Sequence, residues 1–188
     1  MNNETINIEK ALITPVVPAG DEQRVAGVLA AIEEHIGFVP DGLRLYSFSP
    51  PLLEAFVGNI SYFNGGTNIP PALTTMIRYL ASWQAECSFC INMNESFLLN
   101  MGIDHDAIRA ARSNPKAAPL KENEIPLLLL ALRSLDQPKA INQDDLEAVR
   151  KHGWSDRDIF DAVAQAANNR AFNTVLKTFN VEMQGAFA

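Results

Sequence analysis

Apolar side chains in this chain recur at helical spacing along almost its whole length. The apolar segments begin at prolines or at Asp, Asn or Ser residues that can cap a helix, and most of them end at a glycine. The strict alternation of a half-buried strand is almost absent. We therefore expect an all-α fold in which Asp21 caps the first helix. The expected helices cover about residues 21–37, 50–65, 70–83, 87–101, 104–108, 126–135, 142–152 and 155 onward.

The first residues differ from the rest of the chain. Two prolines, Pro15 and Pro18, prevent a regular helix there, so we expect an extended N-terminal arm over residues 1–20. The remaining residues, 21–188, are expected to form a single all-helical domain. A chain of 188 residues that is 47% hydrophobic is large enough for one domain with a substantial core.

Two stretches of the chain echo each other. Residues 100–108 and 151–159 each end a helix at a glycine, continue with a hydrophobic residue and a cap, and place an isoleucine after it. Such a sequence is also a common joint between helices. The repeated order favours a diverged duplication of a helical unit, in which only the first copy carries cysteines.

Charge and hydropathy exclude several classes of function. The formal net charge is −7 and no Lys/Arg cluster is present, so we expect no nucleic-acid partner. The longest apolar run, residues 125–132, is far shorter than a membrane span. The N-terminus lacks the basic and apolar segments of a signal peptide. We therefore expect a cytoplasmic protein without membrane contact, in which neighbouring cysteines are more often catalytic or metal-binding than structural.

The only two cysteines of the chain, Cys87 and Cys90, lie three residues apart. On a helix this spacing puts both sulfurs on one face, at a separation that suits a disulfide. If Cys87 occupies the first turn, the helix N-terminus favours its thiolate, which is the nucleophilic form. One thiol could then attack a peroxide or a disulfide, and the other could resolve the product. The adjacent Glu86 would either oppose a thiolate or accept its proton.

Three interpretations of the pair compete. A redox pair is favoured, because both cysteines belong to one local motif. A zinc site would need two more ligands, and the histidines at 35, 105 and 152 lack ligand spacing, so we expect no metal and no cofactor. The third interpretation is a pair of small buried hydrophobes on a core face.

Other side chains have simpler expected roles. We expect His105 to be solvated, since it follows a helix cap, and Trp83 and Phe89 to belong to the core. The polar residues 168–170 inside the last helix predict a buried network or a subunit contact.

Several segments combine into a resemblance. An apolar stretch runs directly into the cysteine pair and is followed by an asparagine and a further helical segment. The segments concerned are residues 76–85, 94, 98–103, 37–40, 49–56, 153–156, 168–170 and 180–182. In this order and spacing they resemble the alkylhydroperoxidase D-like, or carboxymuconolactone decarboxylase, family, and more closely its peroxidase-related branch. The resemblance covers most of the chain after about Ile32.

The resemblance implies an all-helical fold that assembles into homo-oligomers. Redox members of that family reduce hydroperoxides, or pass electrons between a thiol carrier and a peroxidase partner, through the cysteine pair. Decarboxylase members act on a lactone acid and typically lack the pair, so the cysteines favour the redox side. The resemblance also implies that Cys90 is the thiol that meets the peroxide and that Cys87 resolves the product.

The chain departs from this family pattern where a proton would be accepted. The resemblance implies a glutamate at the position of Thr75 and a histidine at that of Asn94. In some members a further histidine occupies the position of Phe89. Threonine and asparagine are not proton acceptors near neutral pH, so the general base is absent from these positions. Glu86 and Glu95 are the candidate substitutes.

Together these features predict a thiol–disulfide redox protein of the alkylhydroperoxidase D type. Cys87 and Cys90 are its expected catalytic residues, and a small hydroperoxide or a thiol/disulfide redox protein is its expected partner. Two alternatives stay open. One is a non-catalytic relative that keeps the scaffold after losing the proton relay, and the other is a carboxymuconolactone decarboxylase-like lyase in which the cysteines are incidental.

Overall fold

The computed structural model of the chain describes residues 6 and 8–182. These residues form nine α-helices and three short 3-10 helices and contain no β-strand, which confirms the expected all-α class. The helices are α1 (Glu22–Ile36), α2 (Asp41–Leu45), η1 (Tyr46–Phe48), α3 (Pro50–Gly65), α4 (Pro71–Gln84), α5 (Ser88–Asn100), α6 (His105–Ala110), η2 (Pro115–Ala117), α7 (Ile125–Asp136), η3 (Pro138–Ala140), α8 (Gln143–Arg150) and α9 (Asp156–Thr178).

Helix starts follow the capping signals of the sequence, with one exception. Asn142 and Ser155 each form a capping box at the start of α8 and α9, and Asp104 accepts a hydrogen bond from the third residue after it. Asp21 occupies the N-cap position of α1 as predicted, but its side chain makes no capping bond to the helix. The Asp21 carboxylate instead pairs with Arg24 at 3.3 Å.

The Pro-bounded segment after α1 contains more helix than its sequence indicates. It holds α2 and the short η1, and α2 is only five residues long. Such a short helix shows no full period of apolar side chains, so periodicity does not reveal it. Its consequence is tight packing: Gly42, Leu43 and Leu45 of α2 are all buried.

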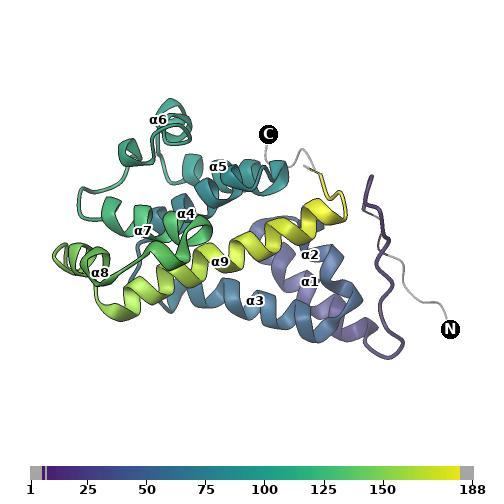
Figure 1. Cartoon of the computed structure of the whole chain (residues 1–188). Coiled ribbons are helices and arrows are strands. Elements are labelled where there is room, and N and C mark those ends of the chain that lie inside the picture. Colours follow the sequence, from purple (N-terminus) through teal and green to yellow (C-terminus); the bar gives the residue numbers. More distant parts are fainter. Residues whose placement is uncertain (1–5, 7, 183–188) are drawn as a thin grey trace.

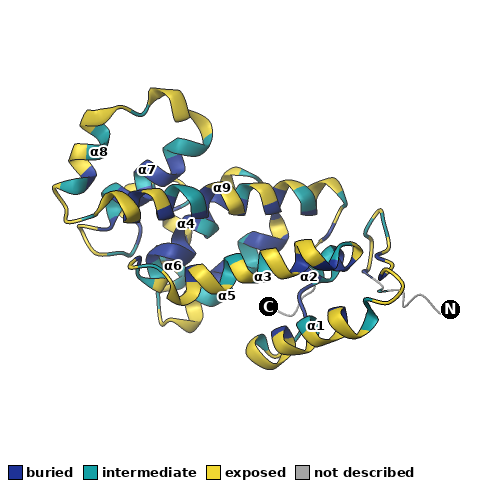
Figure 2. Cartoon of the chain, turned by 90° about the horizontal axis from the view of Figure 1, so that it is seen from below, coloured by how far each residue is buried: buried dark blue, intermediate teal, exposed yellow. Residues whose placement is uncertain are grey.

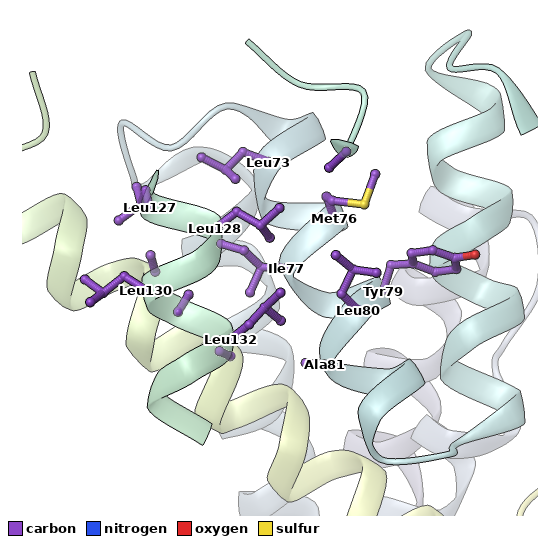
Figure 3. Close-up of a cluster of buried hydrophobic side chains, with 14 of the residues drawn as sticks. Leu73, Met76, Ile77, Tyr79, Leu80, Ala81, Leu127, Leu128, Leu130 and Leu132 are labelled. Carbon is purple, nitrogen blue, oxygen red and sulfur yellow. The ribbon is translucent and has the colours of Figure 1, made fainter. Parts of the chain in front are cut away.

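The main core lies where α4, α7 and α9 meet. Figure 1 shows α9 running along the length of the molecule, between α3 on one side and α4, α5 and α7 on the other. Figure 3 shows leucines of α7 facing Leu73, Ile77 and Leu80 of α4. In Figure 2 the buried surface gathers around α4 and α7, whereas α1 and α3 expose most of their outer faces. Because α4 lies inside the bundle, most of its side chains between Leu73 and Ser82 are buried.

Two smaller clusters occupy the end of the molecule nearest the N-terminus. One joins Val17 to α1, α2 and α3. The other contains both cysteines together with Ile8 and side chains of α2, α5 and α9. Of the expected arm, residues 1–5 and 7 lie outside the described residues, and 8–20 form turns and extended backbone without a helix. This segment is packed, since Ile8 and Val17 are buried and the Leu12 amide donates to Phe179 O at 2.9 Å.

The two echoing stretches form similar joints between helices. Gly102 and Gly153 both have left-handed backbone, with φ of 79° and 92°, and each amide donates to the carbonyl three residues before it. A capping side chain then starts α6 or α9. The duplication itself stays a prediction. Within the described residues, none of the helices has the length and apolar character needed to cross a membrane.

Candidate active site

Cys87 stands at the joint where α4 ends and α5 begins. Its amide donates to Ser82 O at 3.1 Å, and the Glu86 amide donates to Trp83 O at 3.0 Å. These two bonds form a Schellman helix end, whose left-handed position is taken here by Glu86, with φ of 54°. Cys87 then adopts extended backbone as the N-cap of α5. One residue therefore both closes α4 and starts α5, which places the Cys87 thiol at the positive end of the α5 dipole.

The two thiols are buried and adjacent. Cys87 is 2% exposed and Cys90 is 0% exposed, and both are free cysteines. Their side chains hydrogen-bond to each other, so the sulfurs lie close together, as their spacing predicts. The compartment that holds them is apolar, and its buried members include Leu45, Phe89, Phe172 and Leu176. Phe89 is fully buried, as expected for a core residue.

Burial and hydrogen bonding shift the pKa values of the two thiols in opposite directions. The hydrogen bond from Cys90 lowers the pKa of Cys87 to about 7, against the opposing effect of burial. Asn173 and the positive charge of Lys177 add to this lowering. The hydrogen bond to Cys87 and burial raise the pKa of Cys90 well above its ordinary value. The pair therefore favours a thiolate at Cys87 and a proton at Cys90.

An amide network from α9 fixes the pair against α4. Asn173 hydrogen-bonds to both thiols, and its Nδ2 donates to Ser82 Oγ at 3.2 Å. Asn169 Nδ2 donates to Asn173 Oδ1 at 3.0 Å and to Ser82 Oγ at 2.9 Å. The buried network predicted around residues 168–170 thus exists at Asn169, whereas Asn168 is exposed. These bonds hold the Asn173 amide group beside the two sulfurs.

Thr75 and Asn94, which replace the expected glutamate and histidine, are both buried and both bind Arg78. Arg78 Nη2 donates to Thr75 Oγ1 at 3.1 Å, and Arg78 Nε donates to Asn94 Oδ1 at 2.9 Å. Asn94 Nδ2 in turn donates to Cys90 O at 2.8 Å. Two positions where the resemblance implies a proton relay therefore anchor a guanidinium group next to α5.

Glu95, one candidate substitute base, is committed to other partners. Its carboxylate accepts hydrogen bonds from Arg109 at 2.8 Å and Tyr79 at 2.8 Å, and it pairs with Arg112. Burial alone would raise its pKa, but these cationic and hydroxyl partners outweigh burial and lower it. His105 was expected to be solvated, and its side chain is 43% exposed; in addition its Nε2 lies 3.2 Å from Glu95 Oε1.

Glu86, the other candidate base, is exposed at the surface of the joint. It lines an open groove together with residues of α4 and α9, namely Gln84, Ala85, Arg170, Thr174, Lys177 and Thr178. Lys177 Nζ donates to Ala85 O at 2.7 Å, so a cation of α9 holds the turn that leads to Cys87. Trp83 was expected in the core but is 41% exposed, with the Arg112 guanidinium 4.4 Å from its ring centroid.

Sequence reasoning missed Arg78, Ser82 and Asn173. A signal for Arg78 was present, because it is the one charged residue within α4. Asn173 lies one helical turn after Asn169, so a polar face of α9 could have been extended to it. Ser82 carries no such signal. No three His, Cys, Asp or Glu side chains gather to hold a metal ion within the part of the chain that the structure describes.

The chain resembles several solved structures along nearly its whole length. An uncharacterized peroxidase-related protein from Silicibacter sp. TM1040 has a TM-score of 0.84 and 21% identity, and the match covers 96% of this chain and 97% of that one. An uncharacterized peroxidase-related protein with an alkylhydroperoxidase AhpD core, from Ralstonia eutropha JMP134, has a TM-score of 0.79 and 20% identity over 88% and 87% of the two chains.

A third similar structure carries another activity. It is a cysteine-to-alanine variant of the debrominase Bmp8 in complex with 2,3,4-tribromopyrrole, with a TM-score of 0.74 and 18% identity over 98% of this chain and 96% of that one. No family model and no curated protein sequence matches the chain.

These likenesses define the class of fold. The chain is an all-helical protein whose buried thiol pair lies at the start of a helix. Its fold is the alkylhydroperoxidase D-like fold that the peroxidase-related structures share. The resemblance inferred from the sequence is thereby confirmed at the level of the fold.

Proposed function

We propose that the chain is a thiol–disulfide oxidoreductase of the alkylhydroperoxidase D type, in which Cys87 and Cys90 cycle between dithiol and disulfide. The observation that carries this proposal is the placement of two free, buried thiols three residues apart, with Cys87 at the N-cap of α5. Cys87 caps α5 and has a lowered pKa, while Cys90 keeps its proton in a more buried position. A poised thiolate beside a protonated thiol is the arrangement that a two-cysteine reaction requires.

The reaction begins with attack of the Cys87 thiolate on the terminal oxygen of a hydroperoxide. The O–O bond breaks, the alkoxide leaves with the Cys90 proton as an alcohol, and Cys87 becomes a sulfenic acid. The Cys90 thiolate then attacks the Cys87 sulfur, and hydroxide leaves as water after taking a proton from solvent. A disulfide results, and two electrons have passed to the peroxide. These roles reverse the order that the family resemblance implies for the two cysteines.

Single substitutions test this assignment. Cys87→Ser and Cys90→Ser would each be compared with wild type for oxidation by hydrogen peroxide and by an organic hydroperoxide. Intact-mass measurement would follow the products. We expect wild type to lose two hydrogens as a disulfide, and Cys90→Ser to accumulate a sulfenic acid at Cys87. Oxidation of wild type no faster than that of a free thiol would contradict the proposal.

A non-catalytic scaffold is the second candidate, and the burial of both thiols favours it. It requires unreactive cysteines in the native protein. Labelling with a small alkylating reagent at pH 7.5 separates the two candidates, because a poised thiolate reacts quickly once it is reached. If both thiols label only under denaturing conditions, the scaffold reading is supported and the redox reading fails.

The fold also occurs in a debrominase, so the test should include halogenated substrates. Wild type and a Cys87→Ser/Cys90→Ser double variant would be incubated with 2,3,4-tribromopyrrole and a thiol, and bromide release would be measured. The same double variant tests the lyase alternative, in which activity on a small lactone acid survives loss of both thiols. Homo-oligomeric assembly and a cytoplasmic location stay predictions.

A further inference from the structure

Among the residues that the structure describes, Arg78 is the one arginine without a carboxylate partner. The others each form an ion pair: Arg24, Arg44, Arg109, Arg112, Arg133, Arg150, Arg157 and Arg170. Within the described residues, Arg78 binds only the neutral side chains of Thr75 and Asn94. Its positive charge is therefore fixed in place but not compensated by a carboxylate.

The surroundings of Arg78 disfavour the charged form of its guanidinium group. Burial lowers the pKa of Arg78 to about 10, while the nearby Cys90 acts in the opposite direction. The guanidinium group is still charged near neutral pH. An uncompensated cation in a partly buried position stabilises a negative charge that forms near it more than it would in open water, because solvent screening is weaker there.

The negative charge that can form beside Arg78 belongs to Cys90. Asn94 connects the two, since its Oδ1 accepts from Arg78 Nε and its Nδ2 donates to Cys90 O. The charged and titratable groups that act on the pair come from three sides: Tyr46 of η1, Arg78 of α4 and Lys177 of α9. The charge of Lys177 contributes to the lowering of the Cys87 pKa, and the charge of Arg78 opposes the raising of the Cys90 pKa.

We propose that Arg78 supplies the counter-charge for Cys90 when a thiol reductant opens the Cys87–Cys90 disulfide. The inference rests on the proposed function, since it concerns the second half of that cycle. The reductant thiolate attacks the Cys87 sulfur, the S–S bond breaks, and its electron pair leaves on Cys90. A second reductant thiol then displaces Cys87 from the mixed disulfide. The reductant is released as its disulfide, and the cysteine pair takes up protons.

This role explains how the site can work without a general base. A leaving thiol departs faster when its thiolate is more stable, and Arg78 stabilises the thiolate at the more buried sulfur. Arg78 acts on the reacting sulfur through its charge, so it is a positioning residue for that charge. Thr75 and Asn94 serve to aim the guanidinium group, which accounts for neutral acceptors at both positions.

Reduction of a preformed disulfide tests the proposal. Diamide would oxidise wild type, Arg78→Met, Arg78→Lys and Arg150→Met, and 2-mercaptoethanol would then reduce each protein across pH 6 to 9. Arg150→Met is the matched control, because it removes the same charge from a surface ion pair on α8. We expect about tenfold slower reduction in Arg78→Met, an intermediate rate in Arg78→Lys and the wild-type rate in Arg150→Met.

The outcomes separate a role in charge from a role in structure. Equal rates of disulfide reduction in Arg78→Met and Arg150→Met would overturn the proposal. It would also be overturned if Arg78→Met slowed oxidation and reduction equally and melted at a lower temperature than wild type. If Arg78→Met does not fold, Thr75→Val removes one anchor of the guanidinium group at nearly constant volume, and slower reduction is again expected. Because diamide forms the disulfide, a failure of peroxide to oxidise the pair contradicts the proposed function without affecting this measurement.

Discussion

Cys87 and Cys90 share one compartment, but their pKa values are shifted in opposite directions by the groups around each sulfur. Cys87 caps α5 and receives a hydrogen bond from Cys90, whereas Cys90 is enclosed more completely. Because the two thiols hydrogen-bond to each other, the lowered pKa of Cys87 and the raised pKa of Cys90 have one cause, a proton that the pair shares. The reactivity of the pair should therefore follow the ionisation of Cys87.

The first prediction concerns the pH dependence of labelling. A thiolate is the deprotonated form, so a lowered pKa keeps Cys87 reactive at lower pH than an ordinary cysteine. Iodoacetamide labelling at Cys87, followed by peptide mass spectrometry, should rise through a midpoint near pH 7 and level off above it. The Cys90→Ala variant removes the hydrogen bond and should shift the midpoint upward. A wild-type midpoint near 9 would contradict the assignment.

The second prediction concerns Glu95, which is buried and holds Arg109 and Arg112. Glu95→Gln leaves both cations without their carboxylate, so we expect a loss of about 3 kcal/mol in the free energy of unfolding. Urea titration at pH 7 would measure it. Glu147→Gln removes an exposed partner of Arg150 and should cost at most about 1 kcal/mol. An equal effect of both substitutions would contradict the importance of burial.

The sign of the pH effect on Glu95 follows from its lowered pKa. The folded state favours the ionised carboxylate, so its contribution to stability is present above the ordinary glutamate pKa and is lost as the pH falls below it. Glu95→Gln should therefore have a flatter decline in stability between pH 5 and 3 than wild type. An unchanged slope would argue against this role.

Contacts of the site that form within one helix could be predicted from the sequence, whereas contacts between helices could not. The Cys87–Cys90 contact follows from helical spacing, so it could be predicted. The contacts of Arg78 and Asn173 depend on how α4, α5 and α9 pack, and their partners lie up to 91 residues away. The shared proton of the thiols likewise depends on packing, and the order of their roles could not be derived from local sequence.

At the scale of elements, helix starts were predictable wherever a side chain can bond only to its own helix. Asn142, Ser155 and Asp104 cap as expected, since the capping bond spans three residues or fewer. Asp21 does not cap α1, because Arg24 offers its carboxylate a charged partner. Competition between a local bond and an ion pair is not visible in a capping pattern.

The third prediction tests the capping box of α9. Ser155 Oγ accepts from the Asp158 amide at 3.2 Å, and Asp158 Oδ2 accepts from the Ser155 amide at 2.9 Å. Ser155→Ala removes one of these bonds and should lower the free energy of unfolding by about 1 kcal/mol in urea titration. Ser113→Ala is the control, since the exposed Ser113 hydroxyl donates only to Ala110 O. A larger loss in the control would refute the capping role.

At the scale of the molecule, α9 connects the main core to the thiol compartment. Its middle residues pack against α4 and α7, and near its C-terminus Phe172 and Leu176 form a wall beside the cysteines. Gly42 of α2 meets the same wall, since a Cβ there would lie 2.8 Å from Phe172 Cζ and 3.2 Å from Leu176 Cδ1. Helices α2, α5 and α9, which are distant in the sequence, therefore enclose the compartment around the thiols.

The fourth prediction uses this close approach. Gly42→Ala forces Phe172 or its neighbours to move, so we expect a loss of about 1–3 kcal/mol in the free energy of unfolding and faster labelling of Cys87. Gly58→Ala is the matched control, because Gly58 lies on exposed α3 with nothing within 4 Å of its Cβ. That substitution should stabilise by about 0.5–1 kcal/mol. We therefore expect Gly42→Ala to lower the free energy of unfolding and Gly58→Ala to raise it.

The left-handed backbone of Glu86 bears on how solvent reaches the thiols. Gly102 takes the same position after α5 without strain, whereas a side chain there costs about 1–3 kcal/mol. Local unfolding of the joint before Cys87 should therefore be easier than that of its counterpart. In native-state hydrogen exchange, the Cys87 amide, bonded to Ser82 O, should exchange about tenfold faster than the Ile103 amide, bonded to Leu98 O. The strain of one residue would then set how often the buried sulfurs meet water and oxidant.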